Sequence, residues 1–210
     1  MVFEPNEMNV VVMGSWNTAI LTPKGVVEKL FKKEEEFSAE VQVPLEREAP
    51  IRIKYNDIIV IPSNTSLLLL PVAPKIEKLE EAAQACLNAM NALPHTPFHA
   101  VGINIRYKFE STPKSLSDII RSTADNLLTD ADYIIKESTI KRAIKYEIGV
   151  VNLELSEDMD SSHSKIQFNF HCSSQVENMK KWLEYSKKFY FLSKSIIDTI
   201  LKGGTENESI

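Results

Sequence analysis

The feature that most constrains the fold of this chain is a strict alternation of apolar and polar residues over 101–109. Successive side chains of a β-strand point to opposite faces, so an alternation of this length predicts a long strand with one buried and one polar face. A strand of this kind belongs to an antiparallel sheet that is covered on one side only. The apolar positions are Val101, Ile103, Ile105, Tyr107 and Phe109.

The same period of two, or a short apolar run, recurs along the chain and predicts further strands. Pro44 indicates that the strand around it lies at an edge of the sheet or ends there, because proline cannot donate a ladder hydrogen bond. Asn56 and Asp57 predict a tight hairpin turn, whereas 156–164 is expected to be a polar loop. The further strands are expected at 10–13, 37–45, 51–55, 58–61, 67–70, 140–148, 151–155 and 166–170.

Apolar residues at intervals of three and four predict four helices. The helix with the clearest apolar stripe in the first half of the chain is closed by Pro94. Two capping-box patterns, at 115–118 and 174–177, predict the starts of the last two helices. The expected helices follow Thr22 and Pro23, cover 76–93, run over 116–128, and extend over 176–201.

The two halves of the chain share an order of elements. Residues 1–95 are expected to form a strand, a helix, three or four strands and a helix, and 96–204 a strand, a helix, about three strands and a helix. We therefore expect a pseudo-duplicated α+β fold in one compact domain, with an antiparallel sheet covered on one face by two long helices and a polar tail over 205–210.

This order of elements is similar to the duplicated layout of the TATA-binding protein fold. The resemblance covers the element order only, and no motif of that family is present. It implies a fold class and no functional residue.

Charge and composition exclude several classes of protein. With 43% hydrophobic and 25% charged residues, the chain is neither disordered nor collagen-like. Its 24 basic and 29 acidic residues give a net charge of −5, which disfavours nucleic acid as a partner without excluding a local basic surface. The longest apolar runs, 58–61 and 67–72, are too short to span a membrane.

The start of the chain and the cysteines indicate a cytoplasmic protein. Residues 1–9 contain Glu4 and Glu7 and no basic residue, unlike a signal peptide. Cys86 and Cys172 are expected to be reduced thiols.

No motif for catalysis, metal binding or a cofactor is present, so no cofactor and no catalytic residue are predicted. The chain lacks a G-x-S-x-G elbow and a glycine-rich phosphate loop. His95 and His99 are four apart, but Pro94 and Pro97 exclude the helix that would align them on a metal.

Two weaker alternatives for an enzyme site stay open. Glu40, Glu147 and Glu154 are expected on the open face of the sheet, where two of them would form an acid–base pair. His171 and Cys172 adjoin, but neighbouring residues of a strand point to opposite faces.

Two surfaces are candidates for binding. The polar face of the sheet is one, and the basic last helix, with Trp182 and Phe189 buried, is the other. On the sheet face, the candidate residues are Arg52, Lys54, Asn104, Arg106, Lys108, Lys145, Asn169 and His171. On the last helix, they are Lys180, Lys181, Tyr185, Lys187 and Lys188.

These observations favour a non-enzymatic interaction or assembly module that binds a protein partner or a second copy of itself. One alternative is a nucleic-acid binder that uses the sheet face or the last helix. Another is a small-molecule or lipid binder with a cavity between the sheet and a long helix.

Overall fold

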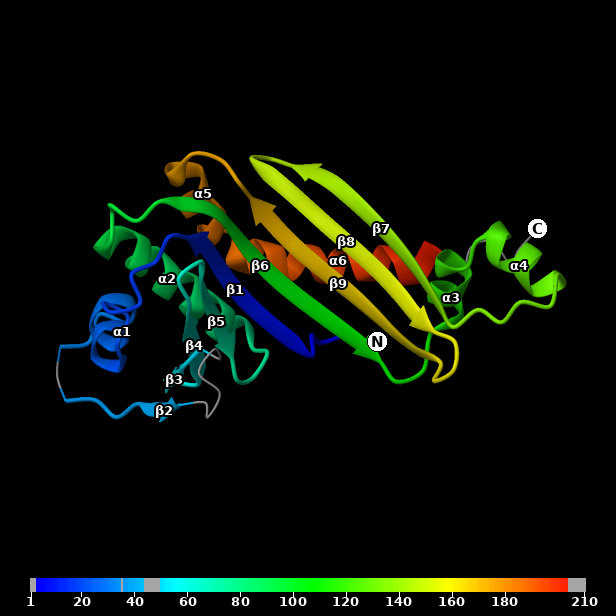
Figure 1. Ribbon diagram of the computed structural model, residues 1–210. Coiled ribbons are helices and arrows are strands. Elements are labelled where there is room, and N and C mark those ends of the chain that lie inside the picture. Colours follow the sequence, from blue (N-terminus) through cyan, green and yellow to red (C-terminus); the bar gives the residue numbers. More distant parts are fainter. Residues whose placement is uncertain (1–2, 35, 44–49, 204–210) are drawn as a thin grey trace.

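The computed structural model describes residues 3–34, 36–43 and 50–203, which form an α+β fold with a nine-stranded sheet and six helices (Figure 1). The strands are β1 (Glu7–Gly14), β2 (Glu40–Gln42), β3 (Arg52–Tyr55), β4 (Ile58–Pro62), β5 (Ser66–Pro71), β6 (Phe98–Phe109), β7 (Glu137–Tyr146), β8 (Gly149–Asp158) and β9 (His163–Cys172). The helices are α1 (Pro23–Leu30), α2 (Ile76–Ala92), α3 (Lys114–Ile120), α4 (Thr123–Asp130), α5 (Val176–Glu184) and α6 (Ser186–Gly203).

The strand order of the sheet is β2-β3-β4-β5-β1-β6-β9-β8-β7, and every neighbouring pair is antiparallel. The first strand of each half therefore lies at the centre, where β1 pairs with β6 over its whole length. Because β1 has a neighbour on both sides, the strand that contains Val10 is an interior strand and offers no free edge for pairing with another chain.

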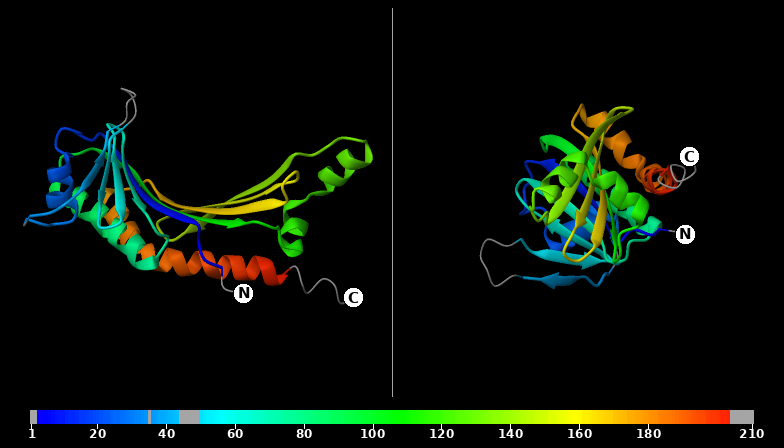
Figure 2. Two further views of the ribbon diagram at one scale, coloured as in Figure 1. Left: turned by 90° about the horizontal axis from the view of Figure 1, so that it is seen from below. Right: turned by 90° about the vertical axis from the view of Figure 1, so that its right-hand side faces the viewer.

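One face of the sheet carries the core. Figure 2 shows α2, α5 and α6 along this face, with the sheet curved away from them. Val10, Val12, Ile103 and Ile105 point into this layer and are fully buried. The alternation over 101–109 is confirmed as part of β6, and so is the antiparallel α+β class.

The expectation of two long helices is not confirmed, because the last one is broken at Tyr185 into α5 and α6. The helix expected over 116–128 is also two helices. Arg121 has an extended backbone (φ −71°, ψ 137°), which ends α3, and the Ser122 side chain accepts a hydrogen bond from the Asp125 N–H to start α4.

Neither predicted capping box has the predicted role. Helix α3 begins after Pro113 and α5 after Gln175, and neither residue caps its helix with a side chain. The capping box that does form, between Ser122 and Asp125, starts α4.

The predicted strands differ from those of the structure mainly in length. The strand expected over 37–45 is reduced to β2, which does lie at the edge, and Pro44 is outside the described residues. The loop expected over 156–164 is largely strand, because β8 and β9 extend to Asp158 and His163 as a long hairpin. The tight turn at Asn56 and Asp57 is confirmed, with φ of 48° and 58°.

An aromatic cluster anchors α5 and α6 to the sheet. Phe170 and Phe189 stack with ring centroids 4.3 Å apart, and Trp182 donates a hydrogen bond from Nε1 to the Phe170 carbonyl oxygen at 3.0 Å. The predicted burial of Trp182 and Phe189 is confirmed. Gly149, at the start of β8, lies against this cluster.

We expect Gly149→Ala to lower the free energy of unfolding by about 1–3 kcal/mol, the usual cost of overpacking. The added Cβ would stand 2.4 Å from the His171 carbonyl oxygen and 2.7 Å from the Trp182 ring, neither of which can move easily. Urea denaturation measures the change. Gly102→Ala is the matched control, because its Cβ would meet the Val11 side chain at 3.1 Å, and an equal loss in both variants would contradict the explanation.

The N-terminal segment is tied to α6 by one carboxylate. Lys194 Nζ donates to Glu4 at 2.7 Å, and the Tyr190 hydroxyl donates to the other oxygen of Glu4. These two hydrogen bonds hold the pKa of Glu4 below its ordinary value. Burial and the Glu4 carboxylate raise the pKa of Tyr190 to about 12, so this hydroxyl stays a neutral donor.

A lowered pKa in the folded state means that Glu4 stabilises the fold above its unfolded pKa and loses this contribution as the pH falls through the folded value. We therefore expect Glu4→Gln to be less stable than the unsubstituted chain at neutral pH. The difference should shrink as the pH is lowered below about 4, near the ordinary carboxylate pKa. Urea denaturation at several pH values measures it. Glu184→Gln, at an exposed residue, is the matched control and should leave the free energy of unfolding at neutral pH nearly unchanged.

Candidate functional site on the open face of the sheet

The face of the sheet opposite α2, α5 and α6 is uncovered across its middle (Figure 2). We call it the open face. The strand residues on it alternate with the buried core residues, so the register of the nine strands determines which side chains meet. Three groups of side chains result: a row of asparagines, a row of charged residues and an apolar strip.

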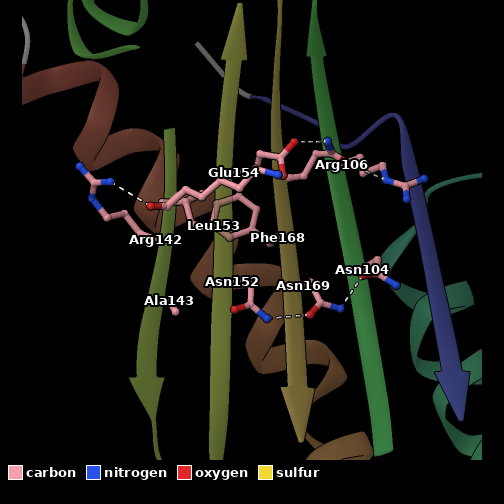
Figure 3. A pocket seen from close by; sticks show the side chains of 11 residues that line it. Asn104, Arg106, Arg142, Ala143, Asn152, Leu153, Glu154, Phe168 and Asn169 are labelled. Atoms are coloured by element: carbon pink, nitrogen blue, oxygen red, sulfur yellow. Dashed lines mark hydrogen bonds and ion pairs between the residues drawn. The ribbon is translucent and has the colours of Figure 1, made fainter. Parts of the chain in front are cut away.

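Four asparagines cross the centre of the open face, one on each of β1, β6, β9 and β8. Figure 3 shows those on β6, β9 and β8. The asparagine row is formed by Asn9, Asn104, Asn169 and Asn152, each directly opposite the next. Asn152 Nδ2 donates to Asn169 Oδ1 at 2.9 Å, and Asn169 Nδ2 donates to Asn104 Oδ1 at 2.8 Å. Asn104 Nδ2 then donates to Asn9 Oδ1 at 2.6 Å.

All these hydrogen bonds run in one direction, and the row ends at an acceptor, since Asn9 Nδ2 donates to Glu7 Oε1 at 3.4 Å. A side-chain amide has two N–H donors and an oxygen with two lone pairs, so each asparagine has hydrogen-bonding capacity beyond its neighbours in the row. The row therefore presents donors and acceptors at the spacing of the strands, about 4.8 Å.

The charged row lies next to the asparagine row and crosses five strands from β1 to β7. It is formed by Glu7, Arg106, Gln167, Glu154 and Lys141. Arg106 donates to Glu7 and, through Nε, to Gln167 Oε1 at 3.0 Å, while Lys141 Nζ lies 2.9 Å from Glu154. The charges of this row are thus largely neutralised within the chain.

The apolar strip occupies the part of the open face formed by β1, β4 and β5. Its members are partly exposed, and each alternates along its strand with a fully buried core residue. Val11 lies opposite Leu68, and Leu70 lies opposite Ile59. The strip consists of Val11, Ile59, Ile61, Leu68 and Leu70.

The surface between the two polar rows is hollowed, with a volume of about 500 Å³ over β6 to β7 (Figure 3). Gly102 lies where the strip meets the asparagine row: a Cβ on it would be 3.1 Å from Val11 and 3.4 Å from Asn169 Nδ2. Apolar and amide groups therefore face the same space at the centre of the sheet.

The sheet-face candidates named in the sequence analysis lie in different parts of the sheet. Asn104, Arg106 and Asn169 lie in the two rows, whereas Arg52 and Lys54 lie on β3, where Lys54 pairs with Glu40 at 3.2 Å. The remaining three lie around the rows: Lys108 on β6, His171 opposite Gly102 on β9, and Lys145 on β7.

The basic candidates on the last helices are partly neutralised. Lys180 pairs with Glu177 at 3.1 Å, and Lys187 lies 3.9 Å from Glu80. Lys188 forms an ion pair with Glu147, and its ammonium group lies over the rings of Tyr146 and Tyr185. Lys181 is exposed. Tyr185 packs against Trp182 and Phe189 at the break between α5 and α6.

The scattered carboxylates do not form an acid–base pair. Glu40 and Glu154 lie on well-separated strands of the open face, β2 and β8. The expectation that Glu147 shares this face is wrong, because Glu147 lies in the turn between β7 and β8. There its hydrogen bond to Lys188 lowers its pKa. The described part of the chain contains no group of three His, Cys, Asp or Glu side chains that could hold a metal.

A further hollow of about 510 Å³ lies between the end of β6 and the C-terminal turn of α6. Its lining combines Phe3, Phe109 and Leu201 with Asp198 and Lys202. This mixture of apolar and charged groups selects no class of ligand.

The sequence analysis missed Asn9, Asn152 and the whole apolar strip. Asn9 and Asn152 each stand between apolar residues that are buried, so the alternation does mark them as open-face residues. The strip was hidden because 58–61 and 67–70 are continuous apolar runs, in which the sequence does not distinguish the two faces.

No known protein family matches the sequence, and a search of curated proteins finds no relative. Among the helices of the described residues, none combines the length and apolar character that a membrane span requires.

We expect Asn104→Ala to cost about 1–2 kcal/mol of unfolding free energy, because it removes two hydrogen bonds and leaves a buried amide without its partner. That amide belongs to Asn9, whose residue is only 6% exposed. Asn152→Ala, at the exposed end of the row, should cost less than about 0.5 kcal/mol. Urea denaturation compares the two, and equal losses would show that the row does not act as a connected chain.

Proposed function

We propose that this chain is a non-enzymatic protein-interaction module whose open face binds an amphipathic helix of a partner protein. The observation that carries the proposal is the apolar strip, which lies beside the asparagine row on a sheet face with no helix across its middle. Apolar side chains gain free energy when a partner covers them, and the amides supply directed hydrogen bonds beside that contact.

Protein is favoured over nucleic acid by the charges of this face. Arg106, Lys141 and Lys54 are each paired with a carboxylate, so they are not free to neutralise phosphates. Around the asparagine row and the charged row, the described open-face positions of β1, β6, β8 and β9 carry no Phe, Tyr or Trp on which bases would stack.

A helix suits this surface better than an extended segment. A strand would need a sheet edge to satisfy its backbone N–H and C=O groups, whereas a helix satisfies most of them internally. The opposite face of the same sheet is covered in this way by α2, α5 and α6 (Figure 2). An apolar stripe on the partner would cover Leu68 and Leu70, with polar side chains of the partner meeting the asparagine row.

We also propose that the two halves are a pseudo-duplication with the layout of the TATA-binding protein fold. This is supported by the strand order, which reads β1-β5-β4-β3-β2 in one direction from the centre and β6-β9-β8-β7 in the other. A cytoplasmic location, likewise proposed, is supported by Cys86 and Cys172, which are both unpaired and buried.

Site-specific photo-crosslinking tests the binding proposal. A benzophenone amino acid in place of Leu70, introduced in cells that contain this chain naturally, should cross-link to a protein. The cross-linked peptide, identified by mass spectrometry, should have apolar residues at i, i+3, i+4 and i+7. As a synthetic peptide it should become helical on binding, as measured by circular dichroism.

The affinity of this peptide for variants provides the control. Leu68→Lys with Leu70→Lys should weaken binding by about tenfold or more, because lysine cannot fill the apolar contact. Phe191→Lys, at an apolar residue of α6 that is also exposed, should leave the affinity unchanged. Cross-links to nucleic acid or lipid, or equal affinity in all variants, would contradict the proposal.

A further inference from the structure

Helix α4 and the segment that joins it to β7 project from the end of the molecule, and none of their residues is buried. Figures 1 and 2 show α4 beyond the N-terminal end of β7, away from the helices that cover the core. No residue of α4 is buried. Leu127, Tyr133 and Ile134 are 66%, 65% and 81% exposed, and Leu128 is exposed as well. Four large apolar side chains are therefore gathered at one end of the chain.

Hydrogen bonds fix this projection in position. Asp125 Oδ2 accepts from the Ser122 backbone N–H at 2.8 Å and from Ser138 Oγ, on β7, at 3.2 Å. The Tyr133 N–H donates to the Leu128 carbonyl oxygen at 3.0 Å and folds the following segment back on α4. The apolar side chains are thus presented by an anchored helix that lacks a covering layer.

Two acidic residues near these apolar side chains are unpaired, whereas the nearby basic residues Arg121 and Lys136 pair with Glu157 and Asp160. Asp130 and Asp132 end α4 and begin the next turn, and neither forms an ion pair with the described residues. A partner for this projection should therefore combine an apolar contact with basic side chains.

The C-terminal half of β7 in the same chain has that chemistry. β7 is the last strand of the sheet, and Arg142, Ile144 and Lys145 on it are exposed. Arg142 donates to the neighbouring Lys141 carbonyl oxygen at 2.9 Å, and neither Arg142 nor Lys145 forms an ion pair with the described residues. Apolar side chains and unpaired acidic residues thus lie beyond the N-terminal end of β7, on and after α4. An apolar side chain and unpaired basic residues lie on the C-terminal half of β7.

We propose that two copies of this chain form a two-fold dimer in which α4 of each copy covers the C-terminal half of β7 in the other. Because α4 lies beyond the N-terminal end of β7, the contact is reciprocal only if the two β7 strands run antiparallel, side by side. A two-fold axis gives this arrangement and uses the same contact twice. The interface meets the open face only at its β7 edge, several strands away from the apolar strip, and it does not depend on the function proposed above.

A groove beside α4 offers a carboxylate and apolar side chains to Arg142 of the second copy. It has a volume of about 320 Å³, and its lining includes Asp125, Tyr133 and Ile134. Arg121 also lines it, but its charge is paired with Glu157 at 3.4 Å. Asp125 would pair with the guanidinium, while the apolar lining contacts the aliphatic stem of the arginine.

The mass of the purified chain in solution is the first test. Light scattering coupled to size exclusion, over a dilution series, should give twice the mass of one chain. Leu127→Glu with Ile134→Glu should raise the dissociation constant of the dimer by about tenfold or more, since both side chains lie at the contact. Because both are exposed, these substitutions leave the core intact. Val72→Glu, at a residue 54% exposed away from α4, is the matched control.

Cross-linking tests the geometry independently. A short bismaleimide should join two copies of Thr139→Cys, an exposed residue of β7 close to the proposed two-fold axis, but not two copies of Val72→Cys. The native Cys86 and Cys172 are buried and should not react. A monomer at all concentrations, a dimer that survives the α4 substitutions, or one that Val72→Glu disrupts equally would each overturn the proposal.

Discussion

The pairing of β1 with β6 is the interaction on which the rest of the structure depends. It joins the two halves of the chain into one sheet, through a register that places Asn9 opposite Asn104 and Val10 opposite Ile103. A slip of one residue would turn the buried valine and isoleucine to the uncovered side and the asparagines into the core. Burying the core therefore fixes the register of this pair, and the register aligns the polar rows.

The same constraint explains why the sequence predicted the strands better than the site. A period of two is a local property, so β6 and β9 could be recognised from their own residues. The asparagine row joins residues far apart in the sequence, such as Asn9 and Asn104, and only the strand order brings them together. Alternation assigns a residue to a face, but it does not give its neighbour.

For the helices, the local pattern of apolar residues predicted longer elements than the structure has. The apolar spacing over 176–201 continues across Tyr185, although the backbone breaks there. In 116–128 the extended conformation of Arg121 separates α3, which packs on the sheet, from α4, which does not. The apolar residues Leu127 and Leu128 fitted a core helix equally well, because a pattern does not reveal whether a partner layer is present.

In the proposed dimer, the interface and the open face are connected by geometry. Two antiparallel β7 strands that lie side by side are related by an axis perpendicular to the sheet, and rotation about this axis keeps both open faces on the same side. Two helix-binding surfaces would then face one partner or one assembly. Once a first helix is bound, a linked second helix meets its site at a high effective concentration, so weak contacts to each strip would give strong binding together. A modest, partly exposed strip such as that around Leu68 and Leu70 is then sufficient for function.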